Sequence, residues 1–184
     1  MTVLVVYASK HGATAEIAER VASTLSASGR AAETHPVDAV GDLTGYEAFV
    51  LGSALYYGHW LKPLTSFVRN HSEELATRPV WLFSSGPLGT ETTEPDGHEK
   101  VDEAEFAEVE DLRKTAHARD HRAFKGVLDP GRLTVVERTI RRLPAGRRLL
   151  PAGDFRDWAE IDGWAGEIAR DLSRDSPGSG QPGD

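Results

Sequence analysis

The chain has 184 residues, a formal net charge of −8 and no cysteine. A chain of this length suits one α/β domain with a full hydrophobic core. Without cysteine it has no disulfide, thiolate metal site or cysteine nucleophile, which fits a cytoplasmic protein, and its negative charge argues against a general nucleic-acid-binding protein.

The N-terminal segment is a strand-like run followed by a helix-like one. Residues 3–8, Val-Leu-Val-Val-Tyr-Ala, are apolar and rich in β-branched side chains. A run without polar alternation predicts a strand buried on both faces, as in a parallel sheet. Residues 9–14 are a short polar loop, and from Ala15 the apolar period is that of a helix. The stripe consists of Ile17, Ala18, Val21, Ala22 and Leu25.

This strand–loop–helix order suits a phosphate-binding site. The first N–H groups of a helix lack intrahelical partners and carry the positive end of its dipole, so a phosphate there accepts several hydrogen bonds. Ser9 and Thr14 add hydroxyl donors, and Gly12 lets the backbone approach closely. Lys10 and His11 add positive charge. The same residues also fit an ordinary loop before a capped helix, so the loop alone leaves both interpretations open.

The rest of the chain alternates between strand-like and helix-like segments. Such alternation predicts a parallel sheet with helices on both faces. The expected domain spans 1–172, and residues 173–184 are rich in Ser, Pro and Gly, which predicts a disordered tail. We expect further strands at 32–37, 48–53, 79–85 and 121–128, and helices at 63–75, 106–116, 133–143 and 158–172.

The first loop carries a family resemblance. Tyr7-Ala8-Ser9-x-x-Gly12-x-Thr14, followed by Ile17-Ala18, resembles the phosphate loop of the flavodoxin family, which binds FMN. The family usually has threonine where this chain has His11. The resemblance implies a flavodoxin-like three-layer sandwich with a five-stranded parallel sheet in the order 2-1-3-4-5. In that order the cofactor cleft opens at the carboxyl ends of strands one and three, where the strand order reverses.

This topology would bring together three loops, at 9–14, 54–60 and 84–90. The second loop has aromatic side chains that could cover a flavin ring, although Trp60 fits packing against the adjoining helix equally well. The third loop has small residues and no aromatic, which would leave one flavin face open to a substrate. The candidate FMN-binding residues are Ser9, Lys10, His11, Gly12, Ala13, Thr14, Ala54, Leu55, Tyr56, Tyr57, Gly58, Ser84, Ser85, Gly86, Leu88 and Gly89.

A second resemblance is narrower. Gly52-Ser53-Ala54-x-Tyr56-Tyr57-Gly58-His59-Trp60 is similar to a segment of the bacterial flavodoxin-type, quinone-dependent protoporphyrinogen oxidases. Residues 91–120 could supply that family's long insertion, and Asp157-Trp158 resembles its late Asp-Trp pair. The resemblance implies an FMN-dependent oxidoreductase that takes electrons from a porphyrinogen and passes them to a quinone.

Other functions remain open on the sequence. The chain could be an electron-carrier flavodoxin without a substrate of its own, or a flavin-free interaction domain on the same fold, and a deazaflavin could replace FMN. No catalytic residue is assigned; His59 could reach the flavin or a substrate, or make a surface hydrogen bond. His117 and His121 are four apart, but without a third ligand we expect exposed histidines near a helix end and no metal site.

A basic segment raises the question of membrane contact. Residues 132–148 contain six arginines and one acidic residue, and Leu149 and Leu150 follow them. The bland interpretation is a helix packed on the sheet with arginines outside. A patch of cationic and apolar groups at 132–150 could also rest on the inner face of an anionic membrane. We expect no transmembrane segment and no signal peptide, and the sequence leaves the oligomeric state open.

Overall fold

A five-stranded parallel sheet forms the centre of the computed structural model, which describes residues 2–56, 59–86, 103–128 and 153–175. The order of its strands is β2-β1-β3-β5-β6. Numbering only the parallel strands along the chain turns this into 2-1-3-4-5, so the predicted fold and strand order are confirmed. The strands are β1 (Thr2–Ala8), β2 (Ala31–Pro36), β3 (Tyr46–Tyr56), β5 (Val80–Gly86) and β6 (Asp120–Lys125).

The third strand is longer than the sequence predicts. It continues past Ser53 and turns into an antiparallel hairpin with β4 (His59–Trp60), in which Leu55 pairs with Trp60 and Tyr56 with His59. The predicted loop at 54–60 is therefore largely strand. The run Ala-Leu-Tyr at 54–56 is apolar and can continue a buried strand, and a hairpin supplies the backbone partners that such an extension needs.

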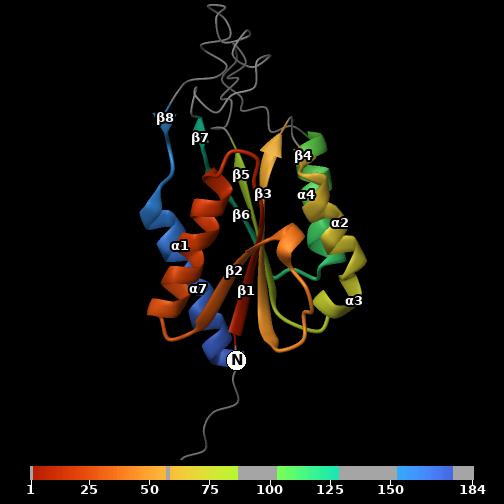
Figure 1. Cartoon of the computed structure of the whole chain (residues 1–184), viewed down its shortest axis with the longest axis vertical. Coiled ribbons are helices and arrows are strands. Elements are labelled where there is room, and N and C mark those ends of the chain that lie inside the picture. The colour runs from red at the N-terminus through yellow and green to blue at the C-terminus, as the bar shows by residue number, and fades with distance from the viewer. Residues whose placement is uncertain (1, 57–58, 87–102, 129–152, 176–184) are drawn as a thin grey trace, which may run out of the picture.

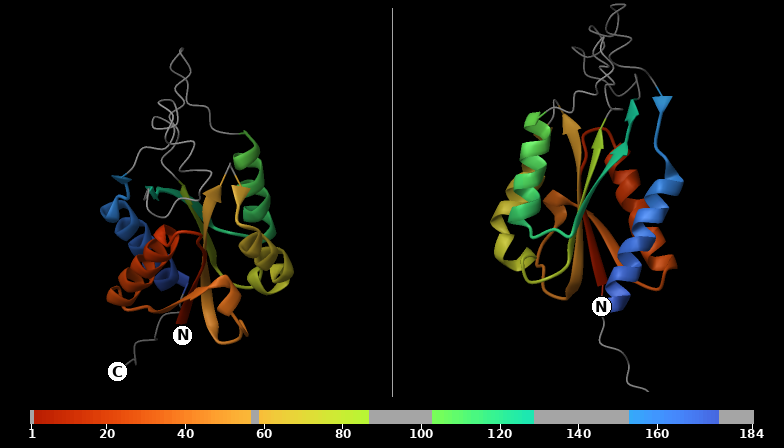
Figure 2. Two further views of the ribbon diagram at one scale, coloured as in Figure 1. Left: turned by 45° about the horizontal axis from the view of Figure 1, so that its top comes forward. Right: turned by 180° about the vertical axis from the view of Figure 1, so that it is seen from behind.

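Helices cover both faces of the sheet (Figures 1 and 2). Two lie on one face: α1 (Ala13–Ala27), which begins two residues before the predicted start, and α7 (Trp158–Asp175). The other face carries α2 (Lys62–Asn70), α3 (Ser72–Leu75) and α4 (Glu103–Thr115). Within the described ranges, no helix is long and apolar enough to cross a membrane.

Smaller elements differ from the predicted boundaries. The predicted strand at 121–128 is divided into β6 and β7 (Val127–Leu128), and β7 pairs with β8 (Gly153–Asp154). A short 3-10 helix, η1 (Val37–Ala39), follows β2. Helix α7 continues through Asp175, so the first three residues of the predicted tail are helical. The helix expected at 133–143 lies outside the described residues, as do residues 87–102 and 176–184.

The core has two halves, one on each face of the sheet. Val3 and Val5 of β1 pack toward α1 and α7, whereas Leu4 and Val6 pack toward α2 and α4. All four side chains are fully buried. A central strand of this kind cannot alternate between polar and apolar residues, which explains the unbroken apolar run.

Gly52 of β3 permits close packing with the neighbouring strand. A Cβ at this position would lie 1.9 Å from the Cζ of Phe83, whose fully buried ring packs against Phe124 and Trp164. We expect Gly52→Ala to lower the free energy of unfolding by about 3 kcal/mol, because the ring has little space into which to move.

The matched control is Gly163→Ala on α7, where a Cβ would meet nothing within 4 Å. This change should instead stabilise the protein by about 0.5–1 kcal/mol. Urea unfolding of both variants checks the pair. If Gly52→Ala is as stable as the wild type, the Phe83 ring does not restrict which side chain position 52 can accommodate.

Candidate functional site

The first loop leaves the carboxyl end of β1 and turns into helix α1. Gly12 is the N-cap of this helix with a φ of 92°, a left-handed conformation that glycine adopts without strain. Its N–H donates to the Oγ of Ser9 at 3.0 Å, and its carbonyl accepts from the N–H of Glu16 at 3.1 Å. The Ser9 oxygen thus accepts a backbone hydrogen bond, while its own hydroxyl hydrogen is available to a ligand.

Thr14 connects the first loop to the third. Its side chain is 1% exposed, and its Oγ1 lies 2.7 Å from the Oγ of Ser85, which belongs to β5. One hydroxyl donates to the other, so the pair keeps one hydrogen for a further acceptor. Thr14, which the sequence predicts as a phosphate donor, thus also forms a buried hydrogen bond to a residue 71 positions away.

Removing either hydroxyl of this pair leaves the other without its partner. We expect Thr14→Val and Ser85→Ala each to lower the free energy of unfolding by about 1–3 kcal/mol. The double variant should lose less than the sum, because it removes both polar groups together. Urea unfolding of the four proteins forms the cycle, and strictly additive losses would contradict the bond.

Tyr56 brings the second loop against the first. The Nζ of Lys10 lies 4.7 Å from the centroid of the Tyr56 ring, and the His11 ring meets the same ring edge-on at a centroid distance of 6.1 Å. Two basic side chains therefore lie beside the N-terminus of α1, where the helix dipole also favours an anion. The basic side chains and the dipole of α1 therefore both favour the binding of an anion here.

The other predicted site residues divide into three groups. Ala13 begins α1, and Gly86 ends β5 at the carboxyl edge of the sheet. Ala54 and Leu55 are buried in β3, so their side chains contribute to packing, and Leu55 pairs with Trp60 in the hairpin. The predictions for Tyr57, Gly58, Leu88 and Gly89 fall outside the described residues.

A pocket of about 450 Å³ opens beside the first loop, on the side of β2. Sequence reasoning missed this side of the site, although Asp38 lies two residues after the end of β2, the strand next to β1. The pocket makes the edge of the sheet concave where the α1 N-terminus lies. Its lining includes Tyr7, Ser9, Gly12, Pro36, Val37, Asp38, Leu61 and Pro63.

Beneath the hairpin, Trp60 belongs to a buried polar chain. The Trp60 side chain is 3% exposed, and its Nε1 donates to the Oγ of Ser84 at 2.8 Å. The same oxygen lies 2.8 Å from the Nε2 of His121 on β6. Of the two interpretations of Trp60, flavin contact and packing, the structure favours packing. The hydroxyl of Ser84 belongs to the same group of buried hydrogen bonds.

The expectation that His121 is exposed was wrong, whereas its assignment to the predicted strand at 121–128 is confirmed, since it lies on β6. Burial is the main cause that lowers the pKa of His121 to about 4; Arg113 acts in the same direction, and Asp120 and Glu110 oppose the shift. His117 sits after α4 with a φ of 51°. Nowhere in the described part of the chain do three His, Asp or Glu side chains come together in a way that could hold a metal ion.

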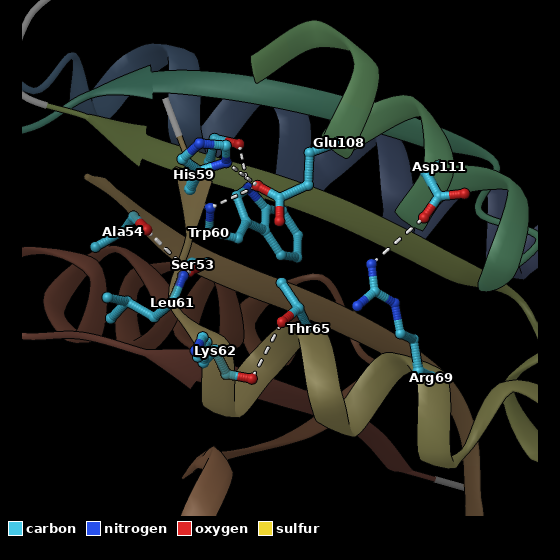
Figure 3. A network of polar contacts seen from close by, with 11 residues as sticks. Ser53, Ala54, His59, Trp60, Leu61, Lys62, Thr65, Arg69, Glu108 and Asp111 are labelled. Atoms are coloured by element: carbon cyan, nitrogen blue, oxygen red, sulfur yellow. Dashed lines mark hydrogen bonds and ion pairs between the residues drawn. The ribbon is translucent and has the colours of Figure 1, made fainter. Parts of the chain in front are cut away.

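Glu108 of α4 fixes the hairpin from the other side (Figure 3). Its Oε2 accepts from the backbone N–H of Trp60 at 3.1 Å and lies 3.1 Å from the Nδ1 of His59. The Oγ of Ser53 accepts from the N–H of Leu61 at 3.0 Å. Sequence reasoning missed Glu108, because it lies 48 residues beyond Trp60 in an acidic segment.

Comparison with known proteins identifies the family. A family model described as a flavodoxin domain matches residues 4–145, well over half of the chain. The chain belongs to the flavodoxin domain family. One relative of this flavodoxin-domain protein is the protoporphyrinogen IX dehydrogenase (quinone) of Escherichia coli strain K12, which is 29% identical over 86 residues. The match covers 46% of this chain and 48% of the relative, so it spans about half of the relative's length.

Solved structures agree on the fold of this flavodoxin-domain protein. A flavodoxin from the domain Archaea has a TM-score of 0.57 at 16% identity, with 94% of this chain and 99% of that chain covered. The oxidised flavodoxin 2 from Bacillus cereus has a TM-score of 0.56 at 16% identity over 94% and 99%. Rubredoxin oxygen:oxidoreductase from Desulfovibrio gigas reaches 0.62 at 13% identity, over 94% of this chain but 36% of that chain.

Proposed function

We propose that this flavodoxin-domain protein is an FMN-dependent oxidoreductase that takes electrons from a porphyrinogen and passes them to a quinone. The observation that carries the proposal is the contact of Tyr56 with Lys10 and His11. It places an aromatic hairpin, which can cover a flavin ring, against a basic loop at a helix N-terminus, which can hold a phosphate.

The residues of the first loop fit a flavin phosphate. The backbone N–H groups that begin α1, the Ser9 hydroxyl and the side chain of Lys10 are all donors, and Gly12 adds no Cβ that would obstruct the approach. The FMN that we propose here would supply the two-electron redox chemistry, and the protein controls access and electrostatics. A deazaflavin with the same phosphate would use the same donors.

The donor and acceptor classes rest on similarity and on the small residues at the end of β5. The Escherichia coli relative is named as a protoporphyrinogen IX dehydrogenase with a quinone. Strand β5 ends in Ser84-Ser85-Gly86, and small residues at this edge of the sheet would leave room beside a flavin. Both points favour an enzyme with its own substrate over a carrier. The net charge of −8 favours the second candidate, a carrier flavodoxin that docks on basic redox partners.

A quinone acceptor also gives the basic segment a role. Residues 132–150, which lie outside the described ranges, would rest on the cytoplasmic face of an anionic membrane and bring the flavin near its oxidant. Sedimentation with anionic vesicles at low and high salt tests this contact. Salt-sensitive binding that is lost in the double variant Arg141→Glu, Arg142→Glu supports it, and no binding at low salt contradicts it.

The function itself is tested by mixing FMN-loaded protein with protoporphyrinogen IX without oxygen. We expect the flavin absorption near ~450 nm to bleach, and a soluble quinone to restore it. A flavin that binds and is reduced only by a partner protein, and never by the porphyrinogen, would favour the carrier. If the purified protein takes up no flavin, the remaining interpretation is a flavin-free interaction domain on the same fold.

A further inference from the structure

The hairpin holds the imidazole of His59 in a defined orientation. Its Nδ1 lies 3.1 Å from the Oε2 of Glu108, which also accepts the backbone N–H of Trp60 (Figure 3). An ionised carboxylate oxygen only accepts hydrogen bonds, so Nδ1 carries the hydrogen of this bond. In neutral His59 the lone pair is then on Nε2, the form in which an imidazole can take up a proton.

His59 also lies at the edge of the candidate flavin site. It pairs with Tyr56 across the hairpin, and Tyr56 contacts Lys10 of the first loop. The side chain of His59 is 59% exposed, whereas that of Glu108 is 23% exposed. An exposed imidazole with a more buried carboxylate behind it can meet a substrate and still keep its orientation.

We propose that His59 is the proton acceptor in the oxidation of the donor and that Glu108 is its positioning residue. This inference rests on the proposed function. A two-electron oxidation of a porphyrinogen breaks a C–H bond at a bridging carbon and an N–H bond at a pyrrole. The proton goes to the Nε2 of His59, and a bound flavin would accept the hydride with both electrons. The Glu108 carboxylate stabilises the resulting imidazolium until the proton passes to solvent.

A second histidine provides a matched control. His71, between α2 and α3, also forms a bond through its Nδ1 to a glutamate, with the Oε2 of Glu74 at 2.6 Å. Its partner belongs to the adjoining helix α3, and neither residue lies on the three loops of the site. His71→Gln therefore removes the same kind of pair at a distance from the proposed chemistry.

The experiment measures single-turnover reduction of FMN-loaded protein by protoporphyrinogen IX without oxygen. We expect His59→Gln to slow reduction about 100-fold, the lower end of the contribution of general base catalysis, and His71→Gln to leave it unchanged. Added imidazole should restore part of the lost rate, and reduction by dithionite should be equally fast in all proteins. FMN affinity should be the same in both variants, which separates the chemical step from cofactor binding.

The role of Glu108 is read from the flavin-free protein. In ¹⁵N NMR spectra at neutral pH, we expect His59 to show a protonated Nδ1 and an unprotonated Nε2, and Glu108→Gln to produce a mixture of tautomers. A mixture already in the wild type would overturn the positioning role. If porphyrinogen reduces His59→Gln as fast as the wild type, the proton-acceptor assignment falls and the proposed function stands. If the wild type is not reduced at all, both fall.

Discussion

Gly12→Asp is expected to weaken FMN binding by at least about 100-fold, because two or more charge-assisted hydrogen bonds of about 1.5–3 kcal/mol each would be lost. Gly12 has a φ of 92° and is the N-cap of helix α1, whose first backbone N–H groups lack intrahelical partners and could donate to an anion. An aspartate there would place its carboxylate where the phosphate is expected, and it would offset the charge of Lys10 and His11.

Gly29→Asp is the matched control for this variant. Gly29 has a φ of 82° and follows the other end of the same helix, in open space. It therefore suffers the same backbone strain and the same change in charge, far from the first loop. Flavin fluorescence titration of both variants checks the prediction. If Gly12→Asp binds FMN as tightly as Gly29→Asp does, the proposal that the first loop binds the phosphate is contradicted.

The buried His121 is expected to make the fold sensitive to acid. Burial lowers the pKa of His121 from 6.5 to about 4 in the folded protein. Between these two values the unfolded chain binds a proton at His121 that the folded chain does not, so the contribution of His121 to stability is lost as the pH decreases from 6.5 to 4. A shift of this size corresponds to about 3 kcal/mol.

The test compares the wild type with His121→Gln, whose amide can still reach Ser84 but does not titrate. Urea unfolding at pH 7 and at pH 4 gives the free energy of unfolding of each. We expect the wild type to lose about 3 kcal/mol more than the variant between these pH values. Equal losses would mean that His121 does not govern the acid response.

The parallel sheet with helices on both faces could be predicted from local patterns in the sequence, whereas the order of its strands followed from the resemblance to the flavodoxin family. An unbroken apolar run such as residues 3–8 is typical of a central parallel strand, and its alternation with helical segments restricts the topology. The first loop could be placed for the same reason. The phosphate site that we propose there rests on six consecutive residues, 9–14, and its prediction needs no knowledge of distant contacts.

The features that could not be predicted depend on pairs far apart in the chain. Nothing near Thr14 indicates that its hydroxyl meets Ser85, and nothing in the acidic segment singles out Glu108 as the partner of His59. The extension of β3 past Ser53 depends on its pairing with β4, which the residues near Tyr56 do not indicate. The partial burial of His121 depends on its contact with Ser84 of β5, which its spacing from His117 does not indicate.

Paired titrations of flavin-free protein with FMN and with riboflavin test the phosphate site that underlies the proposed function. The two ligands share the isoalloxazine ring and differ by the phosphate alone, so the ratio of their dissociation constants measures what the first loop contributes. We predict that FMN binds at least about 100-fold more tightly, since the phosphate accepts several charge-assisted hydrogen bonds that riboflavin cannot form. Equal affinities for FMN and riboflavin would contradict a phosphate site at residues 9–14.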